Sequence, residues 1–576
     1  MAGCNQVEAR RAASGCPRSR TPMTVLLGAS IDHPAPAEAV ERSGILLQGW
    51  ALCAPDPVSR VEISVDGGPT ERARLGVPRP DLEGAFTCPE ACLGGFEHPI
   101  DLGTVPPEAT SATVRARVVA HDGTGFDLPP SNLRLAPLSD PDPDGRAAQL
   151  RARTDLRLSA RQFADSPAAP GELRLLALAG SLQVSGPSLS LVELLQGLAL
   201  LPHLSCSVVA TADGPLRWQL EASGIPVHIC GRFPTTSIDG YEGRIGELAA
   251  WLAPQRHDLL LSNTLRDLPA ADLARRLGVP CVWAVHATEG LPGHPAADPP
   301  GLPRPAAVRE RMEAALAECG LVIVECEATR RALVADAAHP RVVTIPPGID
   351  AAAIERRREE AGAGAERGPH RSGGDGLVVL GLDMVGSGAS QALATLAWSR
   401  VSKRHPDARL MLASTGPEPA PQALRRYLAR AGLEEAVRIP PAGVDRHRHY
   451  AAADILVAAS VEEPLPRTVL EAMSCGVPVV CAAEGGLDEL VEDGRSGWLV
   501  APGDLAALEE GLERALAAGA TARARVARHA RGLVRSRFPV GPHLAAYEEW
   551  LRTAAGLRPP FSRALALAAG EGSNPG

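Results

Sequence analysis

The sequence predicts an α/β protein with two consecutive doubly wound, parallel-sheet domains behind a small all-β sandwich. From residue 172 onward, apolar runs alternate with amphipathic stretches, which is typical of βαβ units whose sheet is covered on both faces. A charged, glycine-rich stretch at 351–375 divides this series in two and is expected to be a linker. Residues 23–138 instead hold short apolar runs separated by Gly, Pro and Asp turns, which indicates the sandwich.

The N-terminal third is expected to contain a lead, the sandwich and a linker. Residues 1–22 carry four arginines and no apolar core, so we expect a disordered lead and no signal peptide. The arginine-rich segment 139–171 is expected to connect the sandwich to the first parallel-sheet domain. The expected strands of the sandwich are VLLGASI, GILLQGWAL, RVEISVDG, ATVRARVVAHDG and NLRLAPL.

The two parallel-sheet domains are expected at 172–350 and 376–555, with a disordered tail at 556–576. The strands expected in the first are LRLLALAG, CSVVAT, IPVHIC, HDLLLSN, PCVWAVH, LVIVEC and RVVTIP. The strands expected in the second are LVVLGLD, ARLMLAS, VRIPP, DILVAAS, PVVCA and GWLV. Ligands of such sheets bind beyond the carboxyl ends of the strands, so we expect a cleft there.

Composition excludes several function classes. The chain has 58 basic and 67 acidic residues, a net charge of −9, with no concentrated basic face, so no nucleic-acid partner is expected. Its 12 cysteines do not form paired CxxC motifs, so no metal site is expected and reduced thiols fit a cytoplasmic location. Lys403 is the only lysine, so arginines must fill any role that usually needs a lysine.

The segment 460–500 holds the residues that best fit a ligand site. It reads strand, loop, helix, strand, loop, helix, with Glu463 in the first loop and Glu471 within the first helix. The helix N-terminus, near Leu465 to Thr468, favours an anion such as a pyrophosphate because its backbone amides and dipole point there. Pro466 suits the first helical turn, and Arg467 could add a charge-assisted bond. The two carboxylates could accept hydrogen bonds from sugar or ribose hydroxyls.

These motifs resemble those of family 4 (group 1) glycosyltransferases, which have the GT-B fold of two Rossmann-like domains facing a cleft. The similarity rests on the two glutamates with seven residues between them, EAMSCGVPVV, GGLDE at 485–489 and GWLVAPGD at 497–504. The resemblance implies that Glu463 contacts the donor sugar and Glu471 the ribose of the nucleotide. For Gly485 and Gly486, a ligand contact and a purely conformational turn both stay open.

The first parallel-sheet domain extends the resemblance. Residues 181–210 resemble the family's glycine loop and first helix, where Gly186 would let the backbone approach a donor phosphate or the acceptor. VWAVHATEG resembles a strand end carrying the family's histidine, here His286, which would contact the donor sugar or the acceptor hydroxyl. The sandwich resembles immunoglobulin-like modules of polysaccharide-active enzymes, and a sugar-binding role, a spacer role and an oligomerisation role all stay open.

The loop 381–388 departs from the family pattern. Where relatives carry the cations that hold the donor diphosphate, this chain has Gly386 and Ser387. Losing a preorganised charge of this kind costs roughly 3–4 kcal/mol of transition-state stabilisation in comparable sites. Arg446, Arg448 or Arg467 could take over this role.

The resemblance implies a hexosyltransferase in cell-surface polysaccharide biosynthesis that moves the sugar from a nucleotide-sugar donor to a glycan or lipid-linked acceptor. It implies retention of configuration, no metal and no other cofactor. The location would be cytoplasmic, with peripheral contact to the inner face of a membrane left open. A catalytically impaired glycan-binding or scaffold protein is the alternative that the altered loop favours. A GT-B-fold epimerase fits the order of the motifs less well.

Overall fold

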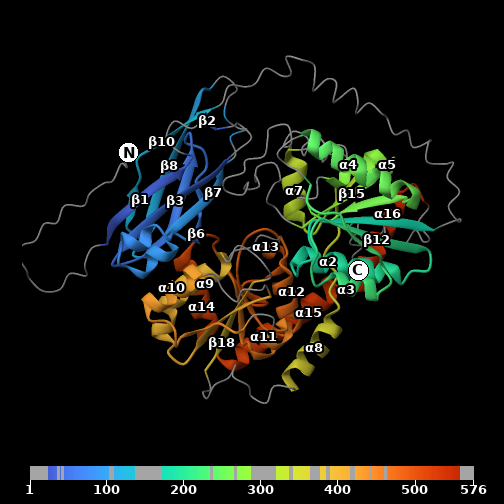
Figure 1. The fold of residues 1–576 in the computed structure, drawn as a ribbon. Helices are drawn as coiled ribbons and strands as arrows, with labels where there is room; N and C mark the ends of the chain where they lie inside the picture. Colours follow the sequence, from blue (N-terminus) through green and yellow to red (C-terminus); the bar gives the residue numbers. More distant parts are fainter. Residues whose placement is uncertain are drawn as a thin grey trace, which may run out of the picture.

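The computed structural model shows a β-sandwich and two parallel-sheet domains arranged around a common centre (Figure 1). It describes residues 24–34, 39–40, 45–100, 102, 105, 109–135, 172–233, 238–264, 269–286, 319–336, 342–363, 376–383, 389–415, 422–441, 444–459 and 464–557. The expected lead at 1–22, the linker at 139–171 and nearly all of the tail at 556–576 lie outside these residues. Within the described residues, no helix combines the length and apolar character needed to cross a bilayer.

The sandwich consists of two sheets whose strands are mostly antiparallel, as the alternating strands predict. The first sheet runs in the order β1 (Val25–His33), β3 (Ile45–Ala54), β7 (Gly95–Ile100) and β6 (Arg74–Val77). The second runs β2 (Ala39–Val40), β10 (Ser131–Leu135), β8 (Ser111–Ala120), β4 (Val58–Val65) and β5 (Glu71–Arg72), with β9 (Gly125–Asp127) beside β8. The five expected strands are present as β1, β3, β4, β8 and β10, and the five strands β2, β5, β6, β7 and β9 were not expected from the sequence.

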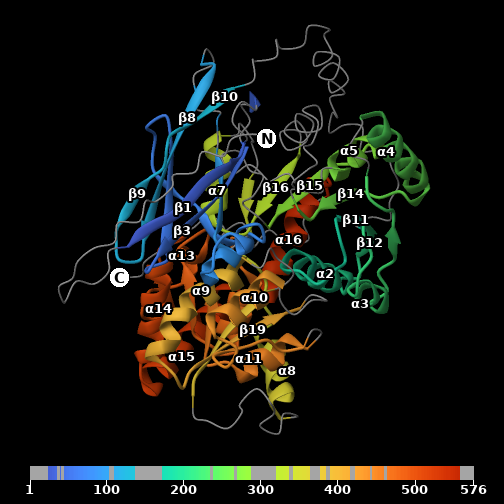
Figure 2. The same ribbon diagram turned by 60° about the vertical axis from the view of Figure 1, so that its left-hand side comes forward.

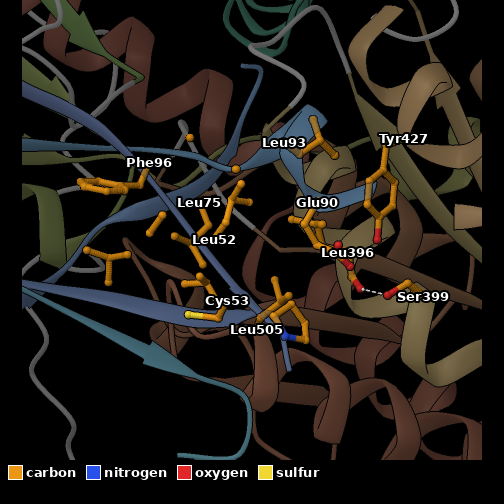
Figure 3. Close-up of a pocket in the computed structure, with 16 residues that line it drawn as sticks. Leu52, Cys53, Leu75, Glu90, Leu93, Phe96, Leu396, Ser399, Tyr427 and Leu505 are labelled. Carbon is orange, nitrogen blue, oxygen red and sulfur yellow. Dashed lines mark hydrogen bonds between the residues drawn. The ribbon is translucent and has the colours of Figure 1, made fainter. Parts of the chain in front are cut away.

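The sandwich shares one hydrophobic core with the second parallel-sheet domain. Buried sandwich residues such as Val61 and Phe96 belong to the same cluster as Trp398 and Leu512 of that domain. Figure 3 shows this junction around a cavity of about 500 Å³, where Leu75 of the sandwich lies opposite side chains of the second domain. The side chains from the second domain are Leu396, Ser399, Tyr427 and Leu505. Such continuity makes the sandwich a structural part of that domain and excludes a freely tethered spacer.

Charged contacts also tie the sandwich to the second domain. Arg400 donates to Asp56 at 3.1 Å, and Arg426 donates to Glu83 at 2.9 Å. The buried Glu509 lies 2.8 Å from the Nε2 of His121. These pairs lie at the edge of the shared core and fix the orientation of the sandwich.

The first parallel-sheet domain is a seven-stranded parallel sheet in the described residues, and every expected strand is present. The order is β13 (Val227–Ile229), β12 (Leu204–Ala210), β11 (Leu173–Ala179), β14 (Leu259–Ser262), β15 (Cys281–Val285), β16 (Leu321–Val324) and β17 (Val342–Thr344). Its helices are α2 (Gly186–Ala199), α3 (Arg217–Ala222), α4 (Ile238–Leu252), α5 (Pro269–Leu277) and α7 (Glu327–Asp336), with a 3-10 turn at Ala253–Gln255. Strand order reverses between β11 and β14, as in doubly wound folds.

The second parallel-sheet domain repeats this plan with six described strands. The order is β20 (Val437–Arg438), β19 (Arg409–Ser414), β18 (Val378–Asp383), β21 (Ile455–Ala458), β22 (Val479–Ala482) and β23 (Gly497–Val500). Its helices are α9 (Ala389–Arg404), α10 (Gln422–Ala431), α11 (Arg446–Ala452), α12 (Arg467–Ser474), α13 (Leu487–Leu490), α14 (Leu505–Ala517) and α15 (Ala520–Arg537). The predicted pair of doubly wound domains is therefore confirmed.

The expected linker at 351–375 differs from the structure in its first half. Residues Ala351–Ala363 form helix α8, which begins after Asp350; the Asp350 side chain accepts a hydrogen bond from the amide of Ala353 at 2.9 Å. Ile354 buries against the second domain, and α8 contacts α11 and α12. The segment was expected to be a linker because its glycine and charge content is high, but it forms a helix that is polar on most of its surface. Residues 364–375 lie outside the described part.

The C-terminal helix α16 (Val540–Ala554) crosses back to the first parallel-sheet domain, although the sequence assigned it to the second. Tyr547 and Leu551 lie in the core of the first domain, and Leu544 packs where Gly197 of α2 has no side chain. His203 pairs with Glu548 of α16 at 2.8 Å. Because its apolar face fits a distant surface, only the tertiary structure could assign this helix.

Candidate functional site

The two parallel sheets meet across a cleft lined by both domains. Helix α2, the ends of β15 and β16, and the chain at 345–349 supply one side; the start of α12 supplies the other. Figure 2 shows α16 beside α2 and β15. Two adjoining pockets occupy it, of about 270 and 460 Å³.

Glu471 lies at the centre of a buried charge cluster on the second domain. Its side chain has no exposed surface. Arg446 donates to both carboxylate oxygens, from Nε at 2.8 Å and from Nη2 at 3.0 Å. Arg467, one turn before Glu471 on α12, donates through Nε at 2.8 Å, and the Tyr450 hydroxyl donates at 3.2 Å. Two guanidinium groups therefore share one carboxylate.

Arg467 also bridges the cleft. Its Nη2 donates to Oε1 of Glu193, on α2 of the first domain, at 2.6 Å. We call Arg446, Glu471, Arg467 and Glu193 the Arg–Glu cluster. Arg448 was a third candidate for a compensating cation, but it is exposed and lies two residues from Arg446 on α11, hence on another side of that helix.

The cluster holds Glu471 ionised. Burial opposes ionisation, but the charges of Arg446 and Arg467 outweigh it and lower the pKa of the Glu471 carboxyl from 4.5 to about 2. Guanidinium groups also bind phosphate oxygens in bidentate geometry. Arg467, the first residue of α12, therefore places one permanent cation in the smaller pocket, where the sequence predicts a diphosphate, and Arg446 of α11 lies next to it across Glu471.

On the opposite side, His286 forms a pair with Glu325. Each lies directly after a strand, β15 and β16, and these strands are neighbours in the sheet. His286 Nδ1 and Glu325 Oε1 are 2.7 Å apart, and both side chains are buried. A carboxylate only accepts hydrogen bonds, so Nδ1 of His286 donates, which fixes the ring orientation. Both residues line both pockets.

A second imidazole, that of His543 on α16, lines the larger pocket. Its Nδ1 donates to the carbonyl of Pro346 at 2.8 Å, and burial lowers the pKa of the ring, which favours the neutral form. Gly348 makes this placement possible, because a Cβ there would lie 2.7 Å from the ring. Tyr547 packs against the other side, with ring centroids 4.8 Å apart.

The remaining predicted residues line or shape the same cleft. Gly186 is the first residue of α2, follows the capping Ser185, and lines the smaller pocket with Leu465. Pro466 is the N-cap residue of α12, directly before the first turn in which it was expected, and its side chain makes no capping hydrogen bond; Thr468 lies in the first turn. The ligand roles predicted for these residues stay predictions.

Gly485 and Gly486 make close contacts that only glycine permits. Gly485 has a φ of +65°, and a Cβ there would lie 3.1 Å from Pro464. At Gly486 a Cβ would lie 2.8 Å from the sulfur of Cys326, which belongs to the first domain. The amide of Gly486 donates to the carbonyl of Pro464 at 2.8 Å. The turn thus holds the chain that leads into α12.

Two predicted features lie outside the described residues. Glu463, predicted to contact the donor sugar, precedes the described segment that starts at 464. Gly386 and Ser387, in the loop that departs from the family pattern, fall within 384–388, which is also outside.

Sequence reasoning missed three residues of the cleft, namely Glu193, Glu325 and His543. Glu325 carried a usable signal, because it directly follows an apolar strand and the carboxyl ends of neighbouring parallel strands lie side by side. Glu193 and His543 carried none, since each looks like an ordinary polar residue of an amphipathic helix.

Comparison with known proteins agrees with this geometry. A family model described as "Glycosyl transferases group 1" matches residues 385–518, and one described as "Glycosyl transferase 4-like domain" matches residues 185–348. A D-inositol 3-phosphate glycosyltransferase of Saccharomonospora viridis is 28% identical over 307 residues, which cover 51% of this chain and 68% of the relative. One of Catenulispora acidiphila is 32% identical, over 45% of this chain and 63% of that protein. The chain thus spans about two thirds of the length of these relatives.

Solved structures show the same fold. Anabaena Alr3699/HepE, in complex with UDP and glucose, superposes with a TM-score of 0.53 at 22% identity, over 66% of this chain and all of that one. Sucrose-phosphate synthase from Thermosynechococcus elongatus gives a TM-score of 0.53 at 18% identity, over 66% of this chain and 99% of that one. At these identities the likeness shows the fold, here GT-B. The chain therefore belongs to the group 1, family 4-like glycosyltransferases.

Proposed function

We propose that the protein transfers a hexose from a nucleotide-sugar to a hydroxyl of a glycan or lipid-linked acceptor, in cell-surface polysaccharide biosynthesis. One observation carries the proposal. Arg467 at the start of α12, which is linked to Arg446 of α11 through Glu471, lines the same pocket as the His286–Glu325 pair of the other domain. A donor diphosphate bound at Arg467 would place its sugar near the His286–Glu325 pair.

The arginines supply the charge that the loop 381–388 lacks. The bond from the sugar C1 to the diphosphate oxygen breaks with its electron pair on that oxygen, so negative charge develops on the leaving nucleotide. The acceptor oxygen bonds to C1, and its proton passes to the diphosphate oxygen that leaves, so the step balances. Arg467 would exchange Glu193 for a phosphate oxygen, and Arg446 would hold Glu471 in place. We propose, with the resemblance, that configuration is retained and that these arginines make a metal unnecessary.

Nucleotide release from a panel of nucleotide-sugars, with and without acceptors, tests this function. We expect Glu463→Gln to abolish release, because the resemblance gives that carboxylate the donor sugar. Arg467→Gln is expected to lower kcat by roughly 10²–10³, the usual cost of losing one preorganised donor. Arg448→Gln is the matched control and should leave kcat unchanged. Release that survives Glu463→Gln undiminished would contradict the proposal.

A noncatalytic glycan-binding or scaffold role is the second candidate. It is favoured by Glu471, whose fully buried carboxylate already accepts four hydrogen bonds, two from Arg446, one from Arg467 and one from Tyr450, and so cannot accept ribose hydroxyls in this arrangement. Calorimetry with UDP distinguishes the two candidates. Binding of UDP without release from any donor would support the scaffold, whereas release would exclude it.

We further propose a cytoplasmic protein with peripheral contact to the membrane. Leu200 and Trp218, at the ends of the neighbouring helices α2 and α3, are 84% and 65% exposed. Indole side chains partition into the membrane interface. We expect Trp218→Ala to reduce co-sedimentation with anionic phospholipid vesicles, while Trp251→Ala, on α4, serves as the control. Equal sedimentation of the wild type with and without vesicles would contradict membrane contact.

A further inference from the structure

The larger pocket of the cleft, between α2 and α16, has a distinctive set of polar groups. Its described lining includes the carboxylates of Glu193 and Glu325 and the imidazoles of His286 and His543. It adjoins the smaller pocket through shared lining residues, so a molecule there would lie next to the start of α12.

Most of these groups accept hydrogen bonds. Both carboxylates are acceptors only. His543 donates through Nδ1 to Pro346, so the other nitrogen of its neutral ring, Nε2, presents a lone pair. Glu325 also accepts the hydrogen bond from Nδ1 of His286, which directs the Nε2 edge of that ring away from the carboxylate. The hydroxyls of Ser190 and Tyr547 also line the pocket and can donate or accept, so the groups that only accept decide the preference. A ligand that matches those groups brings hydrogen-bond donors.

Hydroxyl groups are such donors, and phosphate oxygens are not. A phosphate at this pocket would meet two carboxylates, and the Arg467 guanidinium already lies between Glu193 and Glu471. We propose that this pocket binds the acceptor and that the acceptor group it takes is an uncharged polyol, a sugar or cyclitol without phosphate. That the ligand is the acceptor of the transfer rests on the proposed function. That the ligand is an uncharged polyol rests on the groups that line the pocket.

Glu325 then has a defined task. It is a positioning residue that holds His286 in one orientation, so that the far edge of the ring faces the hydroxyl that attacks the sugar. Glu193 contributes a second acceptor, from the opposite wall and nearer to Arg467. Loss of either charge should weaken a hydroxyl-rich ligand and reduce the discrimination against phosphate.

Matched ligand pairs test the inference on the full-length protein. We would measure binding of myo-inositol against inositol 3-phosphate, and of glucose against glucose 6-phosphate, by calorimetry or saturation-transfer NMR with UDP present. The uncharged member of each pair is expected to bind at least about tenfold more tightly. Glu193→Gln and Glu325→Gln should each narrow this ratio at least about threefold. Glu221→Gln, an exposed glutamate on α3, is the control and should keep the wild-type ratio.

The outcomes separate this inference from the proposed function. Tighter binding of the phosphorylated member, or no binding of any uncharged sugar by protein that binds UDP, would overturn the pocket assignment. Binding of the uncharged sugars without nucleotide release would refute turnover and leave the pocket assignment standing. Thermal melting of each variant identifies one that fails to fold, and the half-exposed Glu193 keeps the test valid if Glu325→Gln does fail.

Discussion

Replacing Leu396 by aspartate is expected to destabilise the second parallel-sheet domain and the sandwich together. Leu396 lies on α9, is 8% exposed, and faces the sandwich at the cavity of Figure 3. Removing a leucine from such a core costs about 2–5 kcal/mol, and an unpaired carboxylate beside Glu90 adds to this cost. Net stabilities of domains are about 5–15 kcal/mol, so much of the folded population would be lost.

Thermal and urea unfolding would measure this effect, with Leu200→Asp as the control. Leu200 is 84% exposed, so its replacement should change the free energy of unfolding by no more than about 0.5 kcal/mol. Because the sandwich and the second domain share one core, we expect Leu396→Asp to lower both transitions as one. If the sandwich unfolds separately and the second domain keeps its wild-type melting temperature, the prediction that the two share one core would be contradicted.

Glu471→Gln is expected to cost about 3–5 kcal/mol of stability, the usual result of removing one partner from a buried ion pair. The guanidinium groups of Arg446 and Arg467 would keep their burial and lose the carboxylate that both of them contact, while Glu193 would still contact Arg467. The matched control is Glu492→Gln, whose partner Arg495 is exposed, and which should cost less than about 1 kcal/mol. Urea unfolding at pH 7 compares them.

Lowering the pH should remove the difference in stability between the wild type and Glu471→Gln. The folded pKa of Glu471 lies below its unfolded value, so its contribution is present above about pH 4.5 and is lost as pH falls toward 2. The shift from 4.5 to about 2 corresponds to roughly 3 kcal/mol, of which about 2 kcal/mol is lost by pH 3. The variant should lack this part of the pH dependence. If the free energy of unfolding of wild type and variant changed with pH in parallel, the lowered pKa of Glu471 in the Arg–Glu cluster would be contradicted.

The local sequence alone determined the strands and their order of appearance. Every expected strand of the two parallel-sheet domains is present, because strands buried on both faces need continuous apolar runs, and such runs are visible in the sequence. In the sandwich, alternation and turn residues predicted the architecture and the strands β1, β3, β4, β8 and β10, but not β2, β5, β6, β7 and β9. The start of α12 could also be located, since proline and the following apolar positions define it locally.

The partners of these elements were decided only in three dimensions. Arg467 and Glu193 are 274 residues apart, and His543 reaches the pocket because α16 crosses back to the first domain. The sandwich could have been a separate module, yet its apolar surface matches that of α9, α10 and α14. Such pairings depend on the complementarity of distant surfaces, which no local pattern encodes, whereas strands and helices depend on the periodicity that each segment carries itself.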